Sequence, residues 1–188
     1  MNNKNKVKTI NKFLKYCKRV TNILSIALSR GVLGEILVYR KLLENGMEPQ
    51  YFGGTKKGFN IKIKKSSKEI TIDCKEKSKP KWVRLHLSDY WKMEVLYKNV
   101  QKKPTKKQPN QPDFYIFVDS QKYLNADKAD FYVFRKNKFC EFARGHYFKN
   151  KSTRKRPKNP KSTDFTLEVS DVKKFRDNDL SKIKKAFR

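Results

Sequence analysis

Residues 58–75, GFNIKIKKSSKEITIDCK, contain the pattern that decides the fold. Apolar and polar residues alternate from Phe59 to Lys64 and again from Glu69 to Lys75, which is typical of half-buried β-strands. The KSSK segment between them is rich in small polar residues and predicts a turn. The stretch therefore predicts a β-hairpin. On its polar face Asp73 and Lys75 lie together, Cys74 turns inwards, and Asn60 can lie beside Asp73.

A helix is predicted before this hairpin, over residues 22–45. Its apolar residues recur at helical spacing, and it ends at Asn45-Gly46, a usual C-terminal stop signal. Glu35 is an acid within this helix. Gly31 and Gly34 are unusual there, because each costs about 1 kcal/mol relative to alanine in a helix interior. Glycines at such positions often allow a close backbone approach, either to a neighbouring element or to a ligand.

The remainder of the chain predicts one more helix before a group of short strands. Residues 87–98 have a helical apolar stripe, and residues 114–118 and 131–134 are nearly continuous apolar runs. Such runs suit strands that are buried on both faces. A strand at 165–169 and a lysine-rich helix from about residue 170 close the chain. This order predicts an α/β or α+β domain around one central sheet.

The charge of the chain points to a polyanionic partner. Lys and Arg number 47 against 18 Asp and Glu, a formal net charge of +29 that repels itself in a compact fold. Hydrophobic residues make up 37% and aromatic residues 13%, enough for a core and too many for a disordered basic tail. No apolar stretch of about 18 residues exists, so no membrane span is expected. Three widely spaced cysteines without a CxxC pair argue against a zinc finger and suit a reducing, cytoplasmic compartment.

The positive charge is concentrated in three parts of the chain. They are the N-terminal segment 1–20, which has the spacing of an amphipathic helix, and the acid-free runs at 101–112 and 149–161, predicted as solvated loops. Lys and Arg side chains in and near such segments are expected to contact phosphates, and arginines are the better candidates for bases. The predicted nucleic-acid contacts are Lys56, Lys57, Lys77, Lys79, Arg84, Lys102, Lys103, Lys106, Lys107, Arg144, Arg154, Lys155 and Arg156.

The order of Glu35, GFNI at 58–61 and ITIDCK at 70–75 resembles the PD-(D/E)XK nuclease superfamily. The resemblance extends over roughly residues 30–135 and includes DFYIFVD at 113–119 as a later strand. It implies the restriction-endonuclease-like αβββαβ core, with a central mixed sheet flanked by helices. The whole chain, residues 1–188, would then be a single nuclease-like domain.

The resemblance also implies roles for individual residues. Asp73 would be a metal ligand, Lys75 the catalytic lysine, Glu35 an additional acid, and the Cys74 carbonyl a further oxygen ligand. The family's first aspartate corresponds to Asn60, which offers a neutral carbonyl oxygen and no charge, so metal affinity should fall. A tolerated variant, a site that has lost catalysis and a deliberate replacement are all compatible with this asparagine.

The expected function is a Mg²⁺-dependent DNA endonuclease of the restriction or repair type, in which Mn²⁺ could substitute. Double-stranded DNA is the expected substrate, and a homodimer would suit cleavage of both strands. The alternatives are a non-catalytic DNA- or RNA-binding protein on the same fold, inactivated at Asn60, and a ribosome-associated basic protein. The choice of DNA over RNA comes from the resemblance, because composition alone favours neither.

Overall fold

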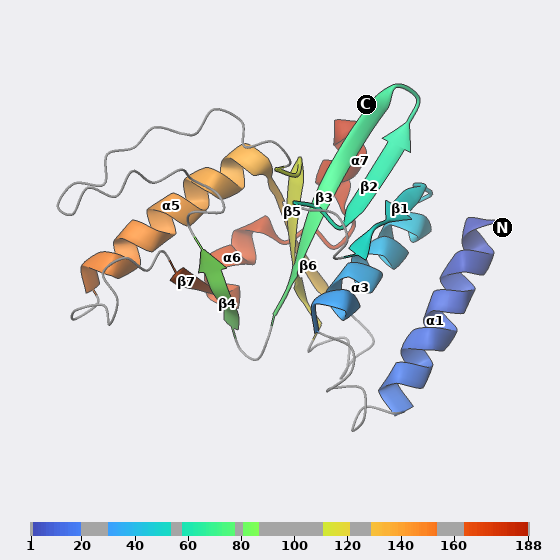
Figure 1. Ribbon diagram of the computed structural model, residues 1–188, viewed down its shortest axis with the longest axis horizontal. Helices are drawn as coiled ribbons and strands as arrows, with labels where there is room; N and C mark the ends of the chain where they lie inside the picture. The colour runs from blue at the N-terminus through green and yellow to red at the C-terminus, as the bar shows by residue number, and fades with distance from the viewer. Residues whose placement is uncertain are drawn as a thin grey trace.

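The computed structural model describes residues 2–19, 30–53, 58–77, 81–86, 111–120, 129–153 and 164–187 (Figure 1). The helices are α1 (Asn3–Arg19), α3 (Arg30–Glu44), α5 (Lys136–Thr153), α6 (Val169–Val172) and α7 (Ser181–Ala186), with a 3₁₀ turn at Lys173–Phe175. The strands are β1 (Pro49–Tyr51), β2 (Ile61–Lys65), β3 (Lys68–Glu76), β4 (Lys81–His86), β5 (Phe114–Asp119), β6 (Asp130–Arg135) and β7 (Asp164–Glu168).

A five-stranded mixed sheet forms the centre of the fold, in the order β1-β2-β3-β5-β6. Strands β3 and β5 are parallel, and the other neighbours in this sheet are antiparallel. Strands β4 and β7 form a separate antiparallel pair. The predicted α/β class, with a central mixed sheet flanked by helices, is confirmed.

The predicted hairpin is formed by β2 and β3. Ile61 pairs with Ile72 and Lys65 with Lys68, and Ser66 adopts a φ of 55° in the turn between them. Just before β2, the Asn60 N–H donates to the Ile72 carbonyl at 2.9 Å. This register brings Asn60 beside Asp73, as the alternation predicts.

The two halves of the central sheet are covered differently. All residues of β5, and all of β6 except Arg135, are buried, which fits strands covered on both faces. One face packs against α3 and α7, and the other against α5. In β2 and β3, by contrast, buried residues alternate with partly or fully exposed ones, so among the described residues only the α3 face is fully covered. We call the uncovered side of β1, β2 and β3 the open face; it carries Gln50, Asn60, Lys62, Lys64, Glu69, Thr71, Asp73 and Lys75.

Helix α3 approaches β3 closely at Gly34. A Cβ at this position would lie 2.9 Å from the Cβ of Glu76. The Gly34 N–H also donates to a Glu76 carboxylate oxygen at 3.0 Å, and the Ser120 hydroxyl contacts the other oxygen of that carboxylate. Gly34 therefore has the role suggested for a glycine inside a helix, and it sets how near Glu35 comes to the sheet.

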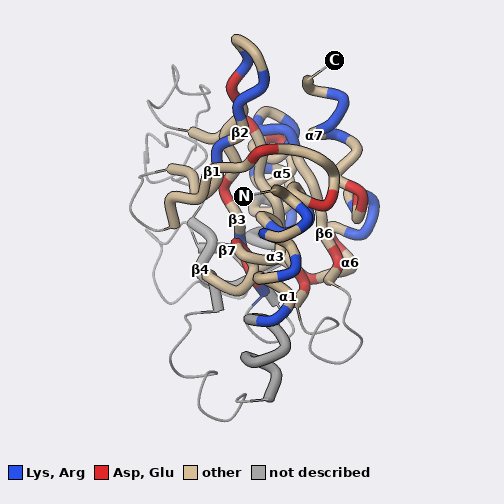
Figure 2. The backbone as a smooth tube through the Cα atoms, turned by 90° about the vertical axis from the view of Figure 1, so that its right-hand side faces the viewer, with Lys and Arg blue, Asp and Glu red and all other residues tan. Residues whose placement is uncertain are grey.

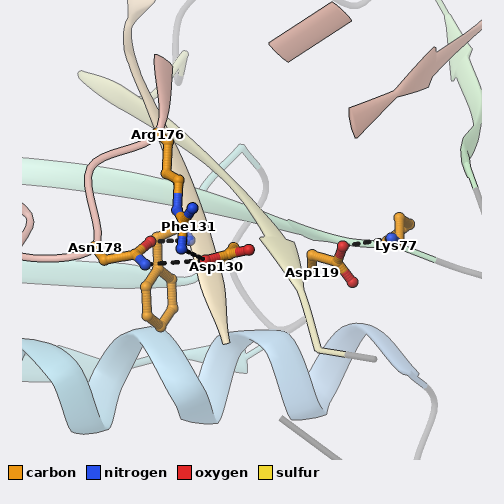
Figure 3. A network of polar contacts seen from close by, with 6 residues as sticks. All are labelled: Lys77, Asp119, Asp130, Phe131, Arg176 and Asn178. Carbon is orange, nitrogen blue, oxygen red and sulfur yellow. Dashed lines mark hydrogen bonds and ion pairs between the residues drawn. The ribbon is translucent and has the colours of Figure 1, made fainter. Parts of the chain in front are cut away.

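A buried polar network lies at one end of the neighbouring strands β3, β5 and β6 (Figure 3). Asp119 and Asp130 face each other across β5 and β6, and both are almost completely buried. Lys77 pairs with Asp119 at 2.5 Å, and Arg176 pairs with Asp130 at the same distance. Asn178 donates to Asp130 and accepts from the Phe131 N–H. The network neutralises two neighbouring acids and attaches the C-terminal segment to β6.

Several predictions differ from the structure. Helix α5 was not predicted, and it takes up the start of the expected loop at 149–161; its stripe of Phe139, Ala143 and Tyr147 packs on the sheet. Strands β1 and β4 were also not predicted.

The single C-terminal helix expected from residue 170 is wrong. The helix ends at Val172 and a new one begins at Ser181, because the Asp177 carboxylate accepts hydrogen bonds from the Ser181 and Lys182 N–H groups. The expected N-terminal helix is confirmed as α1.

The predicted helix at 87–98, most of the loop at 101–112 and residues 154–161 lie outside the described residues. Among the helices that the structure describes, none has the length and apolarity needed to cross a bilayer.

Candidate functional site

Glu35 is a buried acid that faces the sheet from α3. Its side chain is only 7% exposed, and the Tyr51 hydroxyl at the end of β1 donates to it at 2.6 Å. Burial raises the pKa of Glu35 most strongly, the bond from Tyr51 opposes this, and the negative charge of Asp73 raises the pKa further. The positive charge of Lys75 acts in the lowering direction. The net result is a carboxyl pKa above its ordinary value.

Asp73 and Lys75 lie on the open face of β3. Their side chains form an ion pair at 2.9 Å, with Asp73 13% and Lys75 37% exposed. Strand β2 begins at Ile61, opposite Ile72, so β3 continues past the end of β2 at Asp73. Glu35 lies close enough there for its pKa to respond to both charges. The structure thus pairs Asp73 with Lys75 and places Glu35, which comes from the α3 side, within electrostatic reach of both. A common site formed by the three residues stays a prediction.

Asn60 lies next to this cluster and is held by the chain itself. Its Oδ1 accepts the Cys74 N–H at 2.7 Å, and its Nδ2 lies 3.5 Å from the Gly53 carbonyl. An amide oxygen has a second lone pair, so a role for Asn60 as a metal ligand stays a prediction. The observed role is structural, because Asn60 joins the start of β2 to β3.

Cys74 has its side chain in the core, as predicted. It is 5% exposed, and burial raises the pKa of its thiol well above the ordinary value. A thiol in this state is a poor nucleophile. Only the backbone carbonyl of Cys74 is a candidate for a part in the site.

The chemistry of Glu35 and Asp73 fits a hard divalent cation. The negative charge of Asp73 acts on the pKa of Glu35 in the raising direction, and a cation held by both carboxylates would relieve that repulsion. Among the described residues there is no cluster of three or more His, Cys, Asp and Glu side chains. A pair of carboxylates completed by carbonyl oxygens, water and substrate phosphate suits Mg²⁺ or Mn²⁺ better than Zn²⁺.

The prediction that Lys77 contacts nucleic acid is wrong. Lys77 is 6% exposed, and its ammonium group is paired with the buried carboxylate of Asp119. A phosphate would have to break that pair to reach it. Arg84 lies in β4 and Arg144 is half-buried in α5, and both stay predictions. The other predicted contacts lie outside the described residues: Lys56, Lys57, Lys79, Lys102, Lys103, Lys106, Lys107, Arg154, Lys155 and Arg156.

Tyr51 is the residue of this site that the sequence did not indicate. Strand β1 has only three residues, which is too short for an alternating pattern to show. Its backbone pairs with Ile61, and its ring is 41% exposed beside Tyr39. Gly53, with a φ of 56°, leaves room for the Tyr51 hydroxyl, which would lie 3.2 Å from a Cβ at that position.

Comparisons with known proteins give one distant likeness. No family model matches the chain, and no curated protein sequence matches it. A solved structure to which it is similar is that of the bacterial homing endonuclease I-Ssp6803I, at 15% sequence identity and a TM-score of 0.39. The match covers 60% of this chain and 70% of that one. A function for the chain therefore has to be argued from its own site.

Proposed function

We propose that the chain is a Mg²⁺-dependent endonuclease that hydrolyses phosphodiester bonds of double-stranded DNA through a PD-(D/E)XK-like site. The observation that supports the proposal is the Asp73–Lys75 ion pair where β3 extends past β2, with Glu35 within electrostatic reach of both residues. Two carboxylates can hold a cation, and the cation and the lysine together can stabilise the negative charge that develops on a phosphodiester in its transition state.

Glu35 and Asp73 would hold the cation, with the Cys74 carbonyl as a further candidate ligand. When bound, Mg²⁺ supplies positive charge for the phosphoryl oxygens and makes a bound water easier to deprotonate. Burial of Glu35 and its bond from Tyr51 keep that carboxylate in one place. A fixed ligand loses less entropy on binding than a mobile one.

Lys75 would act on the phosphate. Its side chain is partly exposed on the open face, and Asp73 holds its ammonium group at 2.9 Å. An ammonium group in this position can donate to a phosphoryl oxygen or orient the attacking water. The net charge of +29 supports a polyanionic substrate, because neutralised phosphates release counterions on binding.

Tyr51→Phe is expected to raise the half-saturating Mg²⁺ concentration by about tenfold while leaving the fold intact. A hydrogen bond to a charged group contributes about 1.5 to 3 kcal/mol, and each 1.4 kcal/mol is about a factor of ten. The measurement is plasmid cleavage over a Mg²⁺ titration. Tyr39→Phe is the matched control, because it removes a hydroxyl from the ring that packs edge-on against Tyr51. An unchanged Mg²⁺ dependence in Tyr51→Phe would show that this bond does not support the site.

Asn60→Asp tests the proposal at the position that departs from the family pattern. The new carboxylate can still accept the Cys74 N–H, so the fold should be kept. It also adds a charge beside Asp73, and a unit charge at 4 Å contributes about 1 to 4 kcal/mol. We expect the unchanged chain to nick plasmid DNA with Mg²⁺, and the Asn60→Asp variant to do so at a Mg²⁺ concentration about tenfold lower.

The same assay separates the proposal from its alternative. If only the Asn60→Asp variant cleaves DNA, the unchanged chain is a disabled nuclease. Asn60 would then prevent cleavage while the protein still binds DNA. Tight binding without cleavage by either protein would favour a non-catalytic DNA- or RNA-binding module. The hydrogen bond from the Cys74 N–H to Asn60 Oδ1 favours that alternative, because it gives Asn60 a purely structural role.

A further inference from the structure

The open face continues from the proposed site to the turn of the β2–β3 hairpin. We propose that the sugar–phosphate backbone of duplex DNA lies along this face, from Asp73 and Lys75 toward the turn at 66–67, contacted by Lys62 and Lys64. The choice of DNA rests on the proposed function; the position of the surface rests on the covering of the sheet.

Within the part of the chain that the structure describes, the covering of the sheet leaves one approach to Asp73. On one face, Ile61, Ile72 and Cys74 pack into the core with α3. Next to β3, strand β5 is buried on both faces, and α5 covers the side of the sheet that carries Tyr115 and Phe117. The side chain of Asp73 belongs to the remaining surface, the open face of β1–β3. A long substrate that reaches Asp73 therefore has to lie against that surface.

Strand geometry places the lysines of β2 in a row on the open face. Lys62 and Lys64 share a face because side chains alternate along a strand, and they lie about 7 Å apart. One DNA strand carries a phosphate every ~3.4 Å of helix axis, so two cations at this spacing can neutralise two phosphates of one strand. Lys65 and Lys68 flank the exposed turn beyond them. Figure 2 shows the basic residues of this hairpin extending beyond the body of the sheet.

The charges of the face complement a polyanion. Of its described residues, Lys62, Lys64 and Lys75 are positive, and Glu69 and Asp73 are negative. Both acids are paired with lysines of the same face, Glu69 with Lys62 and Asp73 with Lys75, each at 2.9 Å. Lys62 also lies over the rings of Phe52 and Phe59, which fixes its stem. Lys64 is exposed. The face thus has a net positive charge and a pre-positioned lysine.

The test is a binding measurement without metal, in which no cleavage occurs. Anisotropy of a labelled DNA duplex is measured in EDTA over a range of KCl concentrations, with the full chain and its Lys62→Gln/Lys64→Gln variant. Loss of two phosphate contacts should lower the slope of log Kd against log salt by about 1.8. The matched control is Lys184→Gln/Lys185→Gln, which removes the same charge from α7, where Lys184 is half-buried like Lys62 and Lys185 is exposed like Lys64. Helix α7 packs with α3 on the covered side of the sheet.

The expected result is a reduced slope and weaker binding in the open-face variant, with the control close to the unchanged chain. An open-face variant that binds as tightly as the control overturns the inference. The inference is also overturned if the open-face variant loses binding only to a duplex RNA of the same sequence and not to the DNA. Failure of the proposed function would give a different result. The chain would then bind DNA through Lys62 and Lys64 without cutting it, so the DNA-binding surface would stand and only the nuclease activity would be ruled out.

Discussion

Replacing Asp73 by Asn is expected to lower the rate of Mg²⁺-dependent DNA cleavage by about a thousandfold or more, because a cation at such a site contributes several kcal/mol to the transition state. The substitution keeps the size of the side chain and removes one of the two carboxylates of the cluster. It also releases Lys75 from its ion pair. That pair is partly exposed, so its loss should change the free energy of unfolding by less than about 1 kcal/mol. DNA binding in EDTA should remain salt-sensitive and close in affinity to that of the unchanged chain.

Plasmid cleavage and circular dichroism together check this expectation. Glu141→Gln is the control, since it removes an exposed acid of α5 that is paired with Lys138 and is no part of the proposed site. It should leave both cleavage and fold unchanged. Full activity in a folded Asp73→Asn protein would show that the cluster is a surface ion pair and that cleavage, if present, occurs elsewhere.

Lys77→Met is expected to lower the free energy of unfolding by about 3 to 5 kcal/mol, because it removes the buried lysine that is paired with a buried carboxylate. Both side chains of the pair are almost inaccessible, at 6% for Lys77 and 4% for Asp119. Asp119 also faces Asp130 directly across β5 and β6, so the loss of the lysine would leave its charge next to a second acid. Like charges directly opposite in a sheet are destabilising. The measurement is urea unfolding followed by circular dichroism.

Two further variants make that measurement specific. Lys138→Met breaks an ion pair with Glu141 that is 72% and 63% exposed, and such pairs contribute at most about 1 kcal/mol. The double variant Lys77→Met/Asp119→Leu removes both buried charges, and it should recover most of the lost stability. A Lys77→Met variant as stable as Lys138→Met would mean that the buried pair is not formed in solution.

The sheet and its hairpin could be predicted from the sequence because their patterns are local. Alternation over 59–75 needs only one covered face, and the apolar runs of β5 and β6 need only burial on both sides. Helix α5 has no such clarity. Its buried positions, Phe139, Ala143 and Tyr147, are separated by the charged residues Glu141 and Arg144 and by the aromatic residue Phe142, so its stripe is diluted. Strand β4 pairs only with β7, a contact between segments far apart in the chain that no local pattern shows.

Some residues of the proposed site could likewise be predicted from local patterns, and others depend on contacts between distant segments. Asp73 and Lys75 follow from the period of one strand, and Asn60 from the register of one hairpin. Glu35 could be named from its place in a helix, but its approach to Asp73 depends on the glycine contact between α3 and Glu76. Tyr51 could not be found, because its role comes from a three-residue strand folding back on β2. Lys77 was misassigned because a lysine-rich sequence does not show which lysine is buried.

Cation binding measured without DNA tests the proposed metal site at Glu35 and Asp73 most directly. Mn²⁺ is titrated into the chain and into its Asp73→Asn variant, and free Mn²⁺ is followed by electron paramagnetic resonance. If Glu35 and Asp73 hold the cation, the unchanged chain binds Mn²⁺, Mg²⁺ competes for the site, and Asp73→Asn weakens binding by at least about tenfold, as expected for one lost carboxylate charge. Equal Mn²⁺ binding by the two proteins, or none by the unchanged chain, would contradict a metal site at this cluster.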